Sequence, residues 1–234
     1  MPDINHMTPD DFRRLGYQMV DRIADYWSTL QRQAESVPVS SVVIPGEIYA
    51  KLPASAPEKG EAWDAILADL DRVVMPGITH WQHPSFFGYF SANNSGPSVL
   101  AELISAGLGV QGMLWATSPA VTEVEMRVMD WLGRAIGLPE AFLFGETPLA
   151  SSGGGVIQGT ASEAALVAMV AARQRATQGG AAGPLVVYTS TQAHSSIAKS
   201  AAVAGIARST HDPERVRLID VDNELAMHPD AMAR

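Results

Sequence analysis

Cysteine is absent from the 234 residues, which excludes disulfides, thiolate nucleophiles and cysteine-ligated metals. Basic residues are in the minority, with 16 Lys and Arg against 25 Asp and Glu and a net charge of -9. The chain therefore lacks the basic surface that sequence-independent binding to nucleic acid requires. No apolar run is long enough to span a bilayer, and the opening MPDINHMTPDD is polar and acidic, unlike a signal peptide. Together with the missing cysteines, these features lead us to expect a cytoplasmic protein that binds neither membrane nor nucleic acid.

The first 35 residues predict one long amphipathic helix. Thr8 is placed to cap it, Pro9 suits its first position, and two aspartates follow at the positive end of the helix dipole. Apolar side chains then recur at steps of three and four as far as Leu30. This apolar face packs either against its own domain or against a second subunit, and the pattern favours neither.

Helices and loops alternate over the next hundred residues. Residues 36–60 contain Pro and Gly at intervals and predict a surface loop. Helices are expected over 61–75, 98–108 and 118–136, and the last begins at a serine-proline pair and ends at Gly137. The intervening segment, 80–97, is aromatic, interrupted by Pro and Gly, and predicted to be irregular.

The second half of the chain has the pattern of an α/β domain. Two short β-branched segments, PLVVYTS (184–190) and VRLIDVD (216–222), read as strands, and helices are expected over 160–176 and 195–206. Alternation of helix and strand predicts a largely parallel sheet.

The sequence SSGGGVIQGTASEA (151–164) places three consecutive glycines just before a helix. The unpaired N–H groups of a helix N-terminus suit an anion such as phosphate. A P-loop is excluded because Gly159 is followed by Thr160 without a lysine, and Gln158 stands where a dinucleotide fingerprint requires its third glycine. Taken alone, the glycines are equally consistent with a plain flexible loop.

Four motifs occur together and in order: HPSFFGYF (83–90), WATSPAVTEVE (115–125), GGGVIQGTASEA (153–164) and QAHSSIAKSA (192–201). With them the chain resembles the group II pyridoxal-phosphate decarboxylases, most closely the aromatic-L-amino-acid decarboxylases. The resemblance covers nearly the whole chain. It implies the α/β fold type I of the aspartate aminotransferases, a pyridoxal 5′-phosphate cofactor, and a dimer that converts an L-amino acid, aromatic in the nearest relatives, to the amine and CO2.

The resemblance also implies roles for individual residues. Thr160, Ala161 and Ser162 match the segment beneath the cofactor phosphate, in agreement with the helix-terminus argument. His194 matches the histidine that stacks on the pyridine ring and can hold or move a proton there; otherwise it is a capping or core histidine. Glu163 is either part of this segment or an acid that favours the helix dipole.

A second group of positions matches the substrate pocket of the family. Trp81, Tyr89 and Phe90 correspond to residues that line the pocket, where aromatic walls suit an aromatic side chain. Gln111 and Met113 correspond to residues that the other subunit contributes. The chain departs from its closest relatives at Ser91-Ala92, where they have Pro-Thr. Ala92 lacks the hydroxyl that the family directs at the substrate carboxylate, which Ser91 or Asn93 would have to replace.

Two catalytic parts of the family have no match in this sequence. The lysine that holds the cofactor covalently belongs to a His-Lys pair, and the aspartate that pairs with the pyridine nitrogen to an Asp-x-Ala segment. The three lysines are Lys51, Lys59 and Lys199, and none stands in such a pair. We therefore expect an N-terminal portion of a decarboxylase: a dimer-forming helical segment, 1–80, and the first part of the cofactor-binding domain, 81–234. Such a chain would be inactive alone and would work with a second copy, with a complementary C-terminal portion, or with both.

Two other readings stay open. Ser196 and Lys199 have the Ser-x-x-Lys spacing of penicillin-binding serine hydrolases, although the companion motifs are missing. Alternatively, the chain is a non-catalytic dimerisation or regulatory partner. The histidines at 80, 83, 211 and 228 do not have the spacing of metal ligands, so no metal site is expected.

Overall fold

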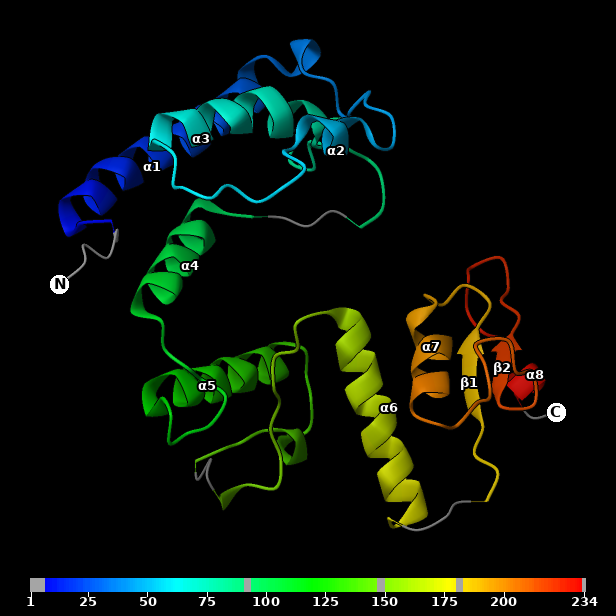
Figure 1. Ribbon diagram of the computed structural model, residues 1–234. Helices are drawn as coiled ribbons and strands as arrows, with labels where there is room; N and C mark the ends of the chain where they lie inside the picture. Colours follow the sequence, from blue (N-terminus) through cyan, green and yellow to red (C-terminus); the bar gives the residue numbers. More distant parts are fainter. Residues whose placement is uncertain (1–6, 91–93, 147–149, 180–182, 233–234) are drawn as a thin grey trace. The chain divides into compact units, whose positions relative to one another are not determined.

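The computed structural model describes residues 7–90, 94–146, 150–179 and 183–232. The chain divides into two compact units, 1–108 and 109–234. Figure 1 shows helices throughout both units and the strands in the second. Each unit is described in turn.

The first unit begins with α1 (Pro9–Arg32), as predicted. Thr8 caps the helix, since its hydroxyl accepts a hydrogen bond from Asp11 N–H at 3.1 Å. Leu15 and Leu30 are buried, whereas Phe12 remains 56% exposed. The apolar face of α1 is therefore covered only in part by its own unit.

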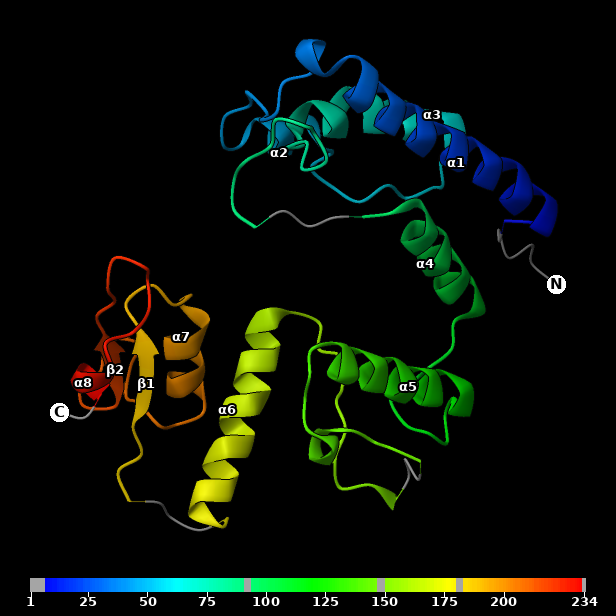
Figure 2. The same ribbon diagram turned by 180° about the vertical axis from the view of Figure 1, so that it is seen from behind.

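Two further helices follow α1 in this unit. α2 (Glu47–Lys51) is a short helix within the segment predicted to be a loop, and it follows Gly46, whose φ of 92° reverses the chain. α3 (Trp63–Asp69) continues as a π-helical turn, Leu70–Val74, and a 3-10 turn, Met75–Gly77. α3 lies beside α1 (Figures 1 and 2), and an ion pair between Arg22 and Asp71 joins α1 to the π-helical turn.

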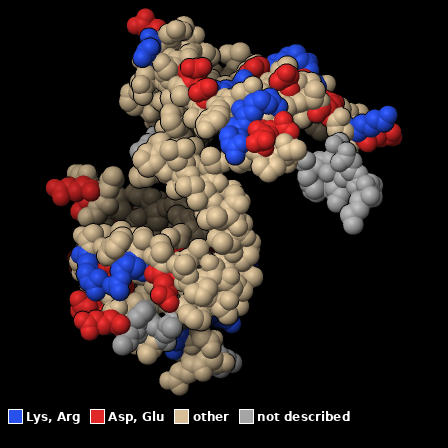
Figure 3. Space-filling model, turned by 90° about the vertical axis from the view of Figure 1, so that its left-hand side faces the viewer, with Lys and Arg blue, Asp and Glu red and all other residues tan. Residues whose placement is uncertain are grey.

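The unit closes with α4 (Gly96–Leu108), within two residues of the predicted helix. Between α1 and α4 lies an apolar groove of about 540 Å³, whose lining includes Phe12, Val20, Ile23 and Leu103. Glu102 is the one charged residue in the sequence of α4. Figure 3 accordingly shows interspersed charges over α1 and an almost uncharged surface over α4.

The second unit opens with two longer helices that match the predictions. α5 (Pro119–Ala135) begins with a proline after Ser118 and is followed by Gly137 in the left-handed region. A 3-10 turn, Glu140–Phe142, leads toward the glycine segment. α6 (Ala161–Thr177) then runs through the alanine-rich stretch.

A β-α-β arrangement completes this unit. β1 (Val187–Ser190) and β2 (Val216–Ile219) pair in parallel, with Val187 opposite Val216, and α7 (Ser196–Val203) connects them. Ala201, Ala207 and Val216 form the core beneath α7, which also contacts α6. The short α8 (Pro229–Met232) follows. The predicted α/β class with a parallel sheet is confirmed.

Both units leave much surface uncovered. The chain exposes 17989 Å², whereas two compact monomers of these sizes would together expose about 12,000 Å². Large apolar side chains contribute to the difference in both units, including Leu103 in α4 and Trp131 in α5. Among the described residues, no helix is both long and apolar enough to cross a membrane.

Candidate functional site

The glycine segment packs against the chain's own backbone before α6 begins. A Cβ atom on Gly153 would stand 2.6 Å from the carbonyl oxygens of both Ala141 and Leu143. Gly154 has a φ of 119°, and a Cβ atom there would collide with the ring of Phe144. These glycines thus allow the backbone to lie close to the segment that follows α5. The N-terminus of α6 lies further along the chain.

Two carboxylates of α5 fix this region. Asp130 is 1% exposed and accepts hydrogen bonds from Phe144 N–H at 2.7 Å and Gly145 N–H at 3.1 Å. Glu125 accepts one from Ile157 N–H at 2.9 Å. A buried carboxylate needs such donors to offset its lost hydration. No role for either acid was predicted from the sequence, in which Asp130 stands between the large apolar residues Met129 and Trp131 of a helix.

The N-terminus of α6 is open to solvent. Thr160 caps the helix by accepting a hydrogen bond from Glu163 N–H at 3.1 Å, and the Glu163 carboxylate folds back toward Gly159. This Thr-x-x-Glu arrangement has the form of a capping box. Ala161 and Ser162 are exposed, and in the described part of the chain no acceptor is recorded for their N–H groups. An exposed hydroxyl and unpaired amides at the positive end of a 17-residue helix form a donor set that fits a phosphate group.

His194 lies in the turn between β1 and α7. Its Nδ1 accepts a hydrogen bond from Ser196 N–H at 3.2 Å, and the ring is exposed. Both views show that α6 begins at the end of this unit at which β1 and β2 terminate (Figures 1 and 2). The structure therefore places His194 and Thr160 at the same end of the second unit.

In the first unit, the segment that follows α3 presents an aromatic cluster. The Trp81 ring lies 4.6 Å from that of Phe86 and 5.8 Å from that of Tyr89, measured between centroids. Tyr89, with a φ of 54°, is 93% exposed, and Phe90 is 96% exposed. Ser91, Ala92 and Asn93 lie outside the described residues.

Gln111 and Met113 belong to the second unit and precede α5. The carbonyl oxygen of Gln111 accepts a hydrogen bond from the Thr117 hydroxyl at 2.7 Å, which shapes the turn before the helix. The Met113 side chain is 74% exposed. Neither side chain packs into the unit that carries it, so both are accessible to another molecule.

Buried histidines join the aromatic segment to α1 and to the turn that follows it. His80 and Tyr26 share a hydrogen bond of 2.9 Å between Nδ1 and the hydroxyl, and burial together with the neighbouring His83 lowers the pKa of His80 below 6.5. Burial also raises the pKa of Tyr26. His83 Nε2 donates to the carbonyl oxygen of Ala34 at 3.0 Å. These side chains form hydrogen bonds within the first unit, and no metal-binding group of three His, Asp or Glu occurs among the described residues.

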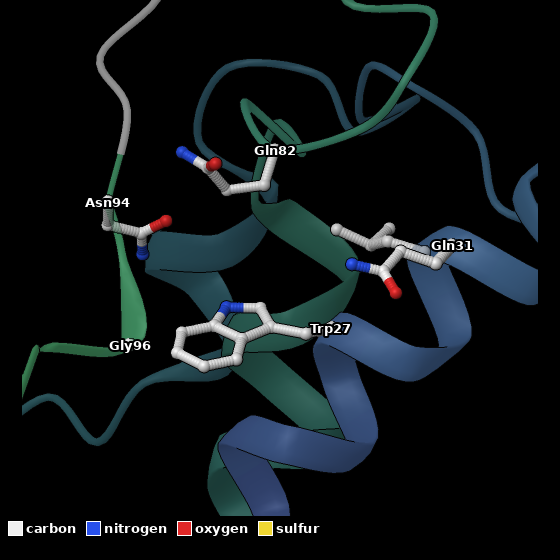
Figure 4. A pocket seen from close by; sticks show the side chains of 6 residues that line it. Trp27, Gln31, Gln82, Asn94 and Gly96 are labelled. Atoms are coloured by element: carbon white, nitrogen blue, oxygen red, sulfur yellow. The ribbon is translucent and has the colours of Figure 1, made fainter.

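A small polar pocket lies where α1 meets this segment. It has a volume of about 230 Å³, and the side-chain amides of Gln31, Gln82 and Asn94 surround the indole of Trp27 (Figure 4). The contact between α1 and the aromatic segment is therefore lined by polar groups at this point.

Two of the three lysines lie on helices, Lys51 on α2 and Lys199 on α7. Lys51 ends α2 and pairs with Glu47 at 2.9 Å, whereas Lys199 is exposed on α7. Ser196 is buried on the same helix, and no hydrogen bond joins it to Lys199 in the part of the chain that the structure describes.

The chain is similar in sequence to known proteins over most of its length. The model of the pyridoxal-dependent decarboxylase conserved domain matches residues 45–234. Phenylacetaldehyde synthase of Arabidopsis thaliana and aromatic-L-amino-acid decarboxylase of Bos taurus are each 43% identical to 97% of this chain, which covers 44% and 46% of their lengths. The chain thus spans about half the length of the curated relatives it matches.

The chain is also similar in fold to solved structures. The complex of Catharanthus roseus tryptophan decarboxylase with L-tryptophan matches 98% of this chain with a TM-score of 0.86 and 36% identity, over 46% of that chain. Oryza sativa TDC with PLP and tryptamine matches 98% with a TM-score of 0.85 and 34% identity, over 48% of its chain. These likenesses confirm the predicted fold class.

Proposed function

Because the chain belongs to the pyridoxal-dependent decarboxylase family, we propose that it serves the decarboxylation of an aromatic L-amino acid to the amine and CO2, with pyridoxal 5′-phosphate as cofactor. The relatives named for a substrate or product act on aromatic compounds, which supports this substrate class. Since they are about twice as long, the proposal concerns the activity to which these 234 residues contribute.

The observation that carries the proposal is the open N-terminus of α6. Thr160 and Ser162 offer hydroxyls, and Ala161 and Ser162 offer backbone N–H groups, to the cofactor phosphate. When bound, pyridoxal 5′-phosphate supplies a pyridine ring that accepts the electron pair left behind as CO2 departs. The residues present fit the phosphate of this group, because they provide hydroxyl and N–H donors at the positive end of the helix dipole.

His194 is proposed to cover one face of the cofactor ring. Its Nδ1 accepts the Ser196 N–H bond, so the neutral imidazole carries its proton on Nε2. That nitrogen is therefore the one able to donate a proton to, or hold it beside, a bound ligand. The turn from β1 to α7, which contains His194, lies at the end of the unit at which α6 begins (Figure 1), and this supports the role.

The substrate side chain is proposed to lie against Trp81, Tyr89 and Phe90, with Gln111 and Met113 contributed by a second subunit. The high exposure of Tyr89, Phe90 and Met113 supports surfaces that another molecule covers. An aromatic substrate would gain from area burial and offset stacking. Ala92 offers no hydroxyl to the substrate carboxylate, so a different group must hold it.

We propose that residues 1–80 help to form a homodimer. The groove between α1 and α4 is lined almost entirely by apolar side chains, among them Phe12 and Leu103. Contiguous apolar patches of this kind mark interaction surfaces in soluble proteins. A second copy, a complementary C-terminal portion, or both would cover the surface that each unit exposes.

The chain by itself is proposed to bind the cofactor without turning over substrate. Lys51, Lys59 and Lys199 do not stand in the family's lysine motif, and Lys51 is engaged with Glu47. Residues 81–234 would then supply the phosphate seat and the ring-covering histidine, while the covalent anchor comes from elsewhere.

Purified chain mixed with pyridoxal 5′-phosphate tests the proposal. Equilibrium dialysis should show binding that Thr160→Val with Ser162→Ala weakens, and visible absorption should not show the band of a lysine-bound cofactor. Assays for amine and aldehyde products with L-tryptophan, L-tyrosine and L-phenylalanine should be negative for the chain alone. Binding that the double variant does not alter would refute the phosphate seat, and robust amine formation would refute the missing anchor.

A further inference from the structure

Trp81, the centre of the aromatic cluster, lies in the sequence between two buried histidines. His80 precedes Trp81, His83 follows it by two residues, and they are 9% and 6% exposed. Trp81 itself is 40% exposed and stacks with Phe86 and Tyr89. Trp81 thus lies at the surface, whereas the histidines on either side of it are buried.

Each histidine reaches back to the helical part of the first unit. His80 shares its hydrogen bond with the hydroxyl of Tyr26, and its ring centroid lies 5.6 Å from that of the tyrosine. His83 donates from Nε2 to Ala34 O at 3.0 Å and accepts at Nδ1 from Ser85 N–H at 3.0 Å. Because a carbonyl can only accept and the Ser85 amide can only donate, this geometry fits the neutral ring with the proton on Nε2.

The remaining contact between α1 and the segment is not a continuous apolar seam. The polar pocket of Figure 4 lies there, bounded by Trp27, Gln31 and Gln82. His80 N–H also donates to Val39 O at 2.9 Å, which is a backbone link that protonation of the imidazole leaves intact. The side chains of the two histidines thus bond the segment around Trp81 to Tyr26 and Ala34, alongside this backbone link.

We propose that His80 and His83 are positioning residues that clamp the wall formed by Trp81, Phe86 and Tyr89, and that protonation of His80 loosens this wall. The inference deepens the proposed function, because Trp81 and Tyr89 are assigned there to the substrate pocket. It predicts that the pocket wall is well ordered above neutral pH and becomes disordered in mild acid.

The environment of His80 agrees with such a response. Among the described residues, the titratable groups recorded beside it are Tyr26 from α1 and His83 from its own segment, and the neighbouring loop contributes the Val39 carbonyl. No carboxylate is recorded there to stabilise an imidazolium. Burial and the charge that His83 would carry both keep the pKa of His80 below its ordinary value of 6.5.

The test uses the fluorescence of Trp81 in the whole chain, obtained as the difference between the natural sequence and Trp81→Phe. Between pH 8 and pH 5 this difference should change in one transition with a midpoint below about 6.5, while far-ultraviolet circular dichroism stays constant. His80→Asn, whose amide can replace Nδ1 toward Tyr26 without ionising, should keep the pH 8 emission and abolish the transition. Tyr26→Phe should already show at pH 8 the emission that the natural chain reaches at pH 5.

His211→Asn serves as the matched control, because His211 is exposed and bonded to Thr210; it should leave the transition unchanged. A flat Trp81 signal, or a transition that persists in His80→Asn, would overturn the proposal. The readout involves neither cofactor nor substrate, so it can fail while pyridoxal 5′-phosphate still binds. Conversely, the pH transition of Trp81 fluorescence can be present when the cofactor does not bind. That result would refute the proposed function and leave the positioning role of His80 and His83 supported.

Discussion

Glu125 and Ile157 are joined by a hydrogen bond of 2.9 Å in which the carboxylate of α5 accepts from the backbone N–H of the glycine segment. Ile157 lies three residues before Thr160, which caps α6. This bond ties the approach to the proposed phosphate seat to a stable helix. The proposed seat thus depends on a side chain, Glu125, that is not itself among the proposed phosphate ligands.

Glu125→Ala should weaken binding of pyridoxal 5′-phosphate to the chain. Loss of one such bond costs about 1 kcal/mol, which corresponds to about fivefold in affinity. Isothermal titration calorimetry measures the change, and Glu125→Gln, which keeps an acceptor, should restore most of it. Glu123→Ala is the matched control, because Glu123 accepts from the Trp115 indole at 2.7 Å and should leave the affinity unchanged; equal losses in both variants would contradict the assignment.

Asp130→Ala should destabilise the second unit. The substitution leaves two backbone N–H groups without their acceptor, at about 1–3 kcal/mol for each group that stays buried and unpaired. Urea unfolding monitored by circular dichroism provides the free energy of unfolding. Asp130→Asn retains one acceptor, so its free energy of unfolding should lie between those of the natural chain and of Asp130→Ala. An alanine variant as stable as the natural chain would show that the loop finds other partners.

Gly153→Ala should be among the more damaging glycine substitutions. The added methyl would stand 2.6 Å from two backbone carbonyl oxygens, and such overpacking costs about 1–3 kcal/mol. Gly60→Ala, where no atom lies within 4 Å of the added methyl, should change stability by less than about 0.5 kcal/mol. Both are compared by the urea midpoint, and similar midpoints for the two variants would argue against tight packing at Gly153.

Phe12→Glu combined with Leu103→Glu should abolish self-association. Both side chains line the apolar groove between α1 and α4, and a charge there must lose hydration when a second copy covers it. Sedimentation velocity should show a dimer of the natural chain and a monomer of the variant. Val42→Glu, at a loop position that is 89% exposed, should remain dimeric; a variant that still dimerises would place the interface elsewhere.

Local signals in the sequence predicted much of this fold. Thr8 with Pro9, Ser118 with Pro119, and Thr160 each mark a helix start within a few residues, and all three helices begin there. Such boundaries are predictable because the signals lie within one turn: Thr8 and Thr160 accept cap hydrogen bonds, whereas the Ser118 side chain makes none and Pro119 marks the start of α5. The short helix α2 was missed, since five residues after Gly46 carry too little periodicity to distinguish a helix from a loop.

The candidate site was predictable only in part. The anion-binding geometry at Thr160 follows from local chemistry, but the reason for Gly153 depends on carbonyl groups of Ala141 and Leu143. The backbone N–H groups that Asp130 accepts from, those of Phe144 and Gly145, lie 14 and 15 residues away in the chain. Such tertiary contacts leave no periodic trace in the sequence, so the supporting carboxylates emerge only from the structure.

The central claim is that the N-terminus of α6 receives the phosphate of the cofactor, and amide chemical shifts test it most directly. In the 15N-labelled chain, pyridoxal 5′-phosphate and inorganic phosphate should both shift the resonances of Ala161, Ser162 and Glu163, whereas pyridoxal without its phosphate should not. Thr160→Val should reduce these shifts. Perturbations that spare these three amides, or that pyridoxal alone reproduces, would contradict the account.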